Sequence, residues 1–129
     1  MKQLLIGSSE RLLCFAEVAE NAWTRGRGLL GRKGLPEGRG LWIRPCKSVH
    51  TCFMGFPIDL AYLAADGTVV KTCSRLQPFR FSAGGRRAHS VLELPAGSLD
   101  QMQVVVGEKL SVSPVATKTS DVELTRAGR

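Results

Sequence analysis

The pattern of apolar and polar residues along this chain is mostly that of short β-strands. Short segments rich in aliphatic and β-branched residues recur between clusters of Gly, Pro, Asp and Ser. Short runs bounded by turn residues are typical of β-sandwiches and barrels. Strands are therefore expected at residues 3–6, 11–19, 41–45, 47–54, 58–64, 68–73 and 90–95, with a strand pair or a bend around Gly107 in residues 104–112.

The strands are separated by a tight turn at one place and by a long connection at another. Asp66-Gly67 stands between two apolar strand segments, which is a strong local signal for a β-hairpin. Residues 74–90 are rich in Gly, Arg and Ser and are expected to form an exposed loop. Helices are expected to be few: Asn21 is a candidate N-cap for a short glycine-containing helix, and Ser98 is one for a further turn or two.

These elements predict an all-β fold, either a compact β-sandwich or a partly closed barrel of about seven short strands with one or two short helices. At 129 residues the chain has the length of one domain. We expect residues 1–114 to form a single β domain and residues 115–129 to form a flexible polar C-terminal tail.

The composition is that of a soluble globular protein, with 43% apolar and 22% charged residues. The N-terminus lacks the apolar core of a signal peptide, and no run approaches the ~18 apolar residues of a membrane span. There is no C-x-x-C pair, and we expect free thiols and a cytoplasmic location. The cysteines are Cys14, Cys46, Cys52 and Cys73.

Positive charge is concentrated in the middle of the chain. The net charge is +7, and residues 21–90 carry twelve Lys or Arg against three acids. This asymmetry favours an anionic partner. One basic cluster surrounds Arg25, and another interleaves Phe79 and Phe81 with arginines. Arginine beside aromatic rings can bind single-stranded nucleic acid, but no recognised nucleic-acid motif accompanies it, so the default interpretation is a solvated basic face and nucleic acid is not favoured as a partner.

A row of potential metal ligands lies in residues 48–54. If this segment is a strand, His50, Cys52 and Met54 share one face. Imidazole, thiolate and thioether groups suit Cu(I) or, with another donor, zinc. Buried strands also hold Cys and Met as packing residues, so the row is interpreted first as core or pocket lining. Soft-metal binding is the alternative.

Two carboxylates interrupt apolar strand segments. Asp59 lies in FPIDLAYL and Glu93 lies in VLELP. A buried carboxylate must accept hydrogen bonds or pair with a cation, so Asp59 is expected to brace a turn or to form a buried ion pair. Together with Glu93 and His50 it could instead form an acid/base site.

Three segments resemble one known family. RGRGLLGRKGLPEGRGLWI, VHTCFMGFPIDLAYLAADGTVV and VLELPAGSLDQMQVVVGEKL are similar, in the same order, to the motifs of domain of unknown function 192, which occurs in small bacterial and archaeal proteins. The resemblance implies a compact β domain with a short N-terminal helix and no established activity. Cys52 and Gly55 depart from the usual aromatic and basic residues. The motif positions are Arg27, Gly28, Leu29, Arg32, Leu35, Pro36, Gly40, His50, Met54, Pro57, Asp59, Glu93, Leu94 and Gly97.

These observations favour a bacterial or archaeal binding or accessory module, without enzymatic activity, for a small or extended anionic ligand. The expected pocket has a basic rim and includes Arg27, Arg32, His50, Met54, Asp59 and Glu93. The ligand or a protein partner is not identified by the sequence. No catalytic residue and no resident cofactor are expected. Soft-metal binding, acid/base catalysis and single-stranded nucleic-acid binding are the alternatives.

Overall fold

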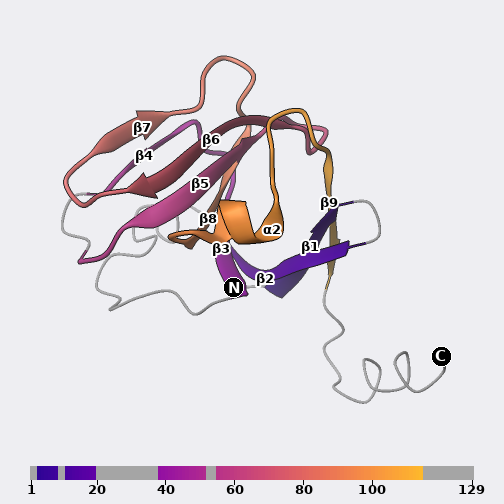
Figure 1. Ribbon diagram of the computed structural model, residues 1–129. Coiled ribbons are helices and arrows are strands. Elements are labelled where there is room, and N and C mark those ends of the chain that lie inside the picture. The colour runs from indigo at the N-terminus through magenta and orange to yellow at the C-terminus, as the bar shows by residue number, and fades with distance from the viewer. Residues whose placement is uncertain (1–2, 9–10, 20–37, 52–54, 115–129) are drawn as a thin grey trace, which may run out of the picture.

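The computed structural model describes residues 3–8, 11–19, 38–51 and 55–114. They form a seven-stranded sheet in the order β6-β5-β8-β3-β2-β1-β9 and a two-stranded sheet of β4 and β7 (Figure 1). The expected all-β class is therefore confirmed. The elements are β1 (Gln3–Ser8), β2 (Arg11–Ala19), β3 (Arg39–Ile43), β4 (Ser48–His50), β5 (Ile58–Leu63), β6 (Val69–Leu76), β7 (Phe81–Ala83), β8 (Ser90–Pro95), α2 (Ser98–Met102) and β9 (Leu110–Pro114).

The large sheet is open, but its two edge strands meet at one end. All neighbouring pairs are antiparallel except β2 and β3, which are parallel. Beside the start of β6, Thr68 forms an isolated bridge with Lys109, which precedes β9. Backbone hydrogen bonds of 2.8–2.9 Å join residues 67–69 to residues 107–110 around this bridge. The sheet thus curls until its edges touch at this end.

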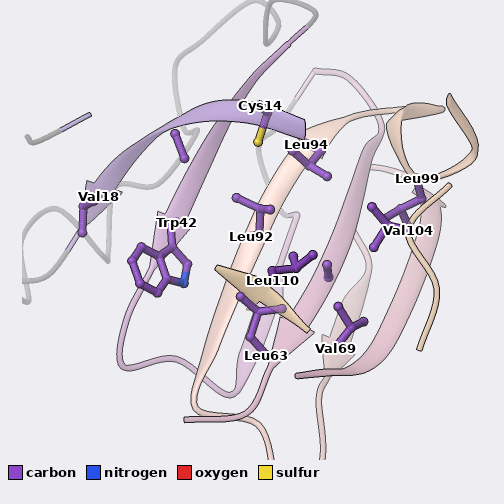
Figure 2. Packing of buried hydrophobic residues seen from close by; sticks show 12 residues of the cluster. Cys14, Val18, Trp42, Leu63, Val69, Leu92, Leu94, Leu99, Val104 and Leu110 are labelled. Carbon is purple, nitrogen blue, oxygen red and sulfur yellow. The ribbon is translucent and has the colours of Figure 1, made fainter. Parts of the chain in front are cut away.

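Both faces of the large sheet are buried at its central strands β5 and β8. Figure 2 shows the cluster on the inner face, which includes Trp42, Leu63, Leu92 and Leu110. A second cluster on the other face contains Leu60 and Tyr62, with Val49 of the small sheet packed among them. Because both faces are covered, every residue of β5 is buried, which explains its nearly continuous apolar run.

The predicted hairpin is confirmed. Gly67 has φ +94°, and its amide donates to the Ala64 carbonyl at 2.9 Å, between the antiparallel strands β5 and β6. The prediction of a loop over residues 74–90 is wrong in part, because β6 continues to Leu76 and β7 lies within that range. Strand β7 has only three residues, and tertiary pairing with β4 creates it.

The expected turn of helix at Ser98 is present as α2, but Ser98 is not its N-cap. The N-cap residue is Gly97, with φ +92° and no capping side chain of its own. The expected strand over residues 47–54 is observed as β4, which covers residues 48–50. The helix expected from Asn21, the segment 52–54 and the tail 115–129 lie outside the described residues.

The three cysteines within the described residues form no disulfide, but their environments differ. Cys14 is buried in the inner cluster, whereas Cys46 and Cys73 are partly exposed. Burial raises the pKa of the Cys14 thiol to about 12. The thiolate is the reactive form of cysteine, so Cys14 is inert in the folded protein.

We expect iodoacetamide at pH 8 to modify Cys46 and Cys73 well before Cys14. Peptide mapping by mass spectrometry after timed quenching measures the order. In urea above the unfolding midpoint Cys14 should react as fast as the other two, which serves as the control. Rapid modification of Cys14 under native conditions would contradict its burial.

Candidate functional site

The buried carboxylate of Asp59 braces two backbone irregularities. Its side chain is fully buried, Oδ1 accepts the Arg75 amide at 2.8 Å, and Oδ2 accepts the Leu99 amide at 2.9 Å. Arg75 has φ +51° and belongs to the bulge of β6 opposite Asp59, while Leu99 lies in the first turn of α2. Asp59 therefore supplies the helix cap that Gly97 cannot, which is the bracing role considered for it above.

Asp59 and Glu93 lie on opposite faces of the sheet. Asp59 is paired in register with Leu94 on the inner face, whereas Glu93 is paired with Leu60 and Leu41 of the second cluster. Successive side chains of a strand point to opposite faces. Glu93 is buried there near Tyr62, whose pKa is raised mainly by burial and further by the Glu93 charge.

The acid/base alternative requires Asp59, Glu93 and His50 to converge, and the structure does not bring them together. His50 is exposed on β4, in the small sheet, and its register partner is Phe81 of β7. The two carboxylates cannot share a proton path across the sheet between them. The acid/base alternative is therefore wrong in its geometry. Asp59 and Glu93 lie on neighbouring paired strands, but their side chains point to opposite faces of the sheet.

Four residues of the predicted pocket and metal site lie outside the described residues, namely Arg27, Arg32, Cys52 and Met54. Within the described ranges, no three His, Cys, Asp or Glu side chains gather as metal ligands. The soft-metal alternative and the basic rim expected from residues 25–32 therefore stay predictions. Of the metal row only His50 is placed, with an exposed side chain.

A hollow of about 340 Å³ lies elsewhere, at the Ser90 end of β8. Helix α2 follows the opposite end of that strand, and Figure 2 shows Leu99 of α2 and Trp42 on opposite sides of the inner cluster. Trp42, Leu63 and Leu110 form the apolar floor. The hollow thus lies against one end of the inner cluster.

Charged and polar side chains surround this floor, on the rim formed by Arg44, Asp66, His89 and Lys109. The Arg44 guanidinium carbon lies 4.2 Å from the centroid of the Trp42 ring, a cation–π contact. The Trp42 indole donates to the buried Ser90 hydroxyl at 2.9 Å, which fixes the ring. Asp66 has a lowered pKa, chiefly because its carboxylate accepts the Thr68 amide and also because Lys109 is near.

Sequence reasoning missed this hollow. Its basic residues, Arg44, His89 and Lys109, come from three separate connections, after β3, before β8 and before β9. One local signal was available: Trp42 and Arg44 are two residues apart at the end of a strand, so they share a face. Lys109 reaches the same place because the edges of the sheet meet there, whereas His89 lies there because its amide donates to the Leu63 carbonyl at 2.8 Å, at the end of the β5–β8 pairing.

The fold and the site define a small all-β domain with a curled, open sheet and a hollow at one end. The model of domain of unknown function 192, described as Uncharacterized ACR, matches residues 6–112, and the chain belongs to this family. It is also 33% identical to UPF0127 protein PF1050 of Pyrococcus furiosus over 97 residues, which cover 71% of this chain and 81% of that protein. The resemblance in the sequence is thereby confirmed.

Two crystal structures share the fold. One, from Sinorhizobium meliloti 1021, is titled a putative transcription regulator. It aligns with a TM-score of 0.76 at 20% identity, over 86% of this chain and 92% of its own. The other, a protein of unknown function from Novosphingobium aromaticivorans, aligns with a TM-score of 0.73 at 16% identity, over 84% of this chain and 83% of its own. At these identities the likeness concerns the fold alone. In the described part of this chain, no helix has the length and apolar character needed to cross a membrane.

Proposed function

We propose that this protein is a non-enzymatic binding module that holds a small anion with an apolar body in the hollow at the Ser90 end of β8. The observation that carries the proposal is the combination of an apolar floor, Trp42 with Leu63 and Leu110, and a rim bearing Arg44, His89 and Lys109. Its volume of about 340 Å³ lies within the usual range for small-molecule sites, roughly 300–1,000 Å³.

Each part of the hollow has a role in this proposal. The floor removes apolar surface of the ligand from water. Arg44, held against Trp42, offers a planar guanidinium suited to a carboxylate or phosphate. Lys109 adds a second positive charge beside the rim. Asp66 carries a negative charge on the same rim, and it disfavours ligands with a high negative charge.

The test is a titration followed through the indole N–H resonance of Trp42 in a ¹⁵N-labelled sample. The probes are hexanoate, phenyl phosphate, inorganic phosphate and hexylammonium. We expect the first two to shift this resonance, inorganic phosphate to bind more weakly because it lacks an apolar body, and hexylammonium not to bind.

We expect Lys109→Ala and Arg44→Gln each to weaken binding of the favoured probe about tenfold, the effect of losing one charge-assisted contact. Arg86→Ala is the matched control, because Arg86 is an exposed cation outside the hollow. If no anionic probe binds, or if the two rim variants bind as well as the unmodified protein, the proposal is overturned.

A further inference from the structure

Two phenylalanine rings are presented to solvent where β6 connects to β7. Phe79 is 62% exposed and Phe81 is 70% exposed, with Arg80 between them. We call these three residues the aromatic tip. In Figure 1 the connection from β6 to β7 lies at the far end of the small sheet, away from β1 and β9. The tip shares no residue with the hollow.

The backbone of the tip is held in a costly conformation. Phe79 has φ +61°, a left-handed conformation that is rare for a bulky side chain. The turn is fixed by the buried residue Thr51, whose hydroxyl donates to the Gln77 carbonyl at 2.6 Å and accepts the Arg80 amide at 2.8 Å. The Thr51 carbonyl also accepts the Phe79 amide at 3.0 Å. Exposed rings on a strained but well-anchored turn point to a functional role.

The exposed face of the two-stranded β4–β7 sheet, next to the aromatic tip, carries planar and small side chains. In the register of β4 and β7, His50 is opposite Phe81 and Ser48 is opposite Ala83, and all four residues are exposed. The register partner of Phe81 therefore carries a second planar side chain, the His50 imidazole. Polar and small neighbours leave the Phe81 ring on a solvated face.

The charge around the tip has one sign. Residues 47–51 and 77–87, which include both strands of the small sheet and the turn before β7, carry four Lys or Arg and no Asp or Glu. Lys71 donates to the Ala83 carbonyl at 2.6 Å, so its ammonium group lies beside β7. Arg86 and Arg87 follow β7 and are exposed. Cations therefore lie beside β7 and directly after it in the chain.

We infer that the aromatic tip and the β4–β7 sheet form a binding surface for single-stranded nucleic acid. Unpaired bases stack on Phe79 and Phe81, and arginines contact the phosphates. Single strands are favoured over duplexes because only unpaired bases expose their faces to the rings. The polar surroundings of Phe81, with His50 and Ser48, suit bases better than acyl chains. This inference does not rest on the proposed ligand of the hollow.

The experiment measures fluorescence anisotropy of a labelled ten-nucleotide oligo-dT, an oligo-U of equal length and a ten-base-pair duplex. The test variant combines Phe79→Asn with Phe81→Ser, because asparagine tolerates the left-handed backbone. The matched control combines Val105→Ser with Val106→Ser, which removes two exposed apolar side chains elsewhere. Thermal melting of each variant establishes that it is folded.

We expect single strands to bind more tightly than the duplex, and the Phe variant to bind them at least tenfold more weakly, since stacking on each ring contributes this order of affinity. The Val variant should bind like the unmodified protein. In a salt titration, Arg80→Ala should reduce the slope of the logarithm of the binding constant against the logarithm of the salt concentration by about 0.7. This is the change expected when one contact to a phosphate of a single strand is lost.

Three results would overturn the inference: equal binding by the Phe variant, preference for the duplex, or no binding of either single strand. Vesicles of phosphatidylcholine and phosphatidylglycerol are tested in parallel. Binding to these vesicles without binding to oligonucleotides would assign the tip to an anionic membrane surface instead. Lys109→Ala, which removes a cation of the hollow, should leave oligonucleotide binding unchanged, so failure of either proposal is seen separately.

Discussion

Replacing Asp59 by alanine is expected to lower the free energy of unfolding by about 3–5 kcal/mol, because two hydrogen bonds to a buried charged group are lost. The Leu99 amide would lose its acceptor at the start of α2, and the Arg75 amide would lose its acceptor in the bulge of β6. The N-cap residue, Gly97, has no side chain that could replace Asp59 as the cap of this helix. The measurement is urea unfolding followed by circular dichroism.

Two further variants make the test of Asp59 specific. Asp59→Asn keeps the size of the side chain but offers only one carbonyl oxygen, so it should be intermediate between alanine and the unmodified protein. Asp100→Ala is the matched control, because Asp100 is exposed and its ion pair with Arg75 is long, at 3.6 Å. It should change stability by less than about 0.5 kcal/mol. Equal stabilities of the Asp59 and Asp100 variants would contradict the bracing role.

Gly67→Ala is expected to cost about 2–4 kcal/mol of unfolding free energy, from backbone strain together with a steric clash. Gly67 has φ +94°, and a Cβ there would collide with the Leu110 carbonyl oxygen. The Leu110 amide donates to the Gly67 carbonyl at 2.9 Å, so the two backbones cannot separate without losing a hydrogen bond at the point where the sheet edges meet. Thermal and urea unfolding would measure the loss.

The control for Gly67 is Gly107→Ala in the facing segment. Gly107 has a similar φ of +98°, but apart from its chain neighbours no described residue comes within 4 Å of an added Cβ. Its substitution carries the backbone cost alone, about 1–2 kcal/mol. The difference between the two variants isolates the close approach of the two segments. If both variants lose the same stability, the edges of the sheet do not meet tightly there.

The contact between residues 67–69 and 107–110, which is expected to stabilise the fold, also forms part of the proposed binding site. Gly67, Lys109 and Leu110 line the hollow and take part in that contact. The position of Lys109 relative to Arg44 therefore depends on the curl of the sheet. A small anion held by both cations would link the strand β3 to the segment before β9.

Local pattern was sufficient for most strands of this protein but not for the small sheet. The hairpin at Asp66-Gly67 and the strands at residues 11–19, 58–63 and 90–95 follow from apolar runs and turn residues. Strand β7 was missed because its three residues have an exposed-buried-exposed pattern within a polar segment. It is a strand because β4 pairs with it and Thr51 fixes the preceding turn.

For the candidate site residues too, local sequence pattern indicated part of the result and tertiary structure decided the rest. That Asp59 needed hydrogen-bond partners followed from its apolar surroundings, but the identity of these partners did not. Its partners are the backbone amides of Arg75 and Leu99, 16 and 40 residues away in sequence. No local pattern could indicate them, because every residue type carries an amide.

By itself, the sequence determined the all-β class, the family, the central hairpin and the basic character of the middle of the chain, since these depend on residue type and on spacing along the chain. Tertiary structure decided which side chains meet. Strand alternation placed Asp59 and Glu93 on opposite faces, and the curl of the sheet brought Lys109 to the hollow that Arg44 also lines. Such proximity depends on pairing between distant segments, and the free energy that selects this pairing comes from burying both faces of the sheet at once.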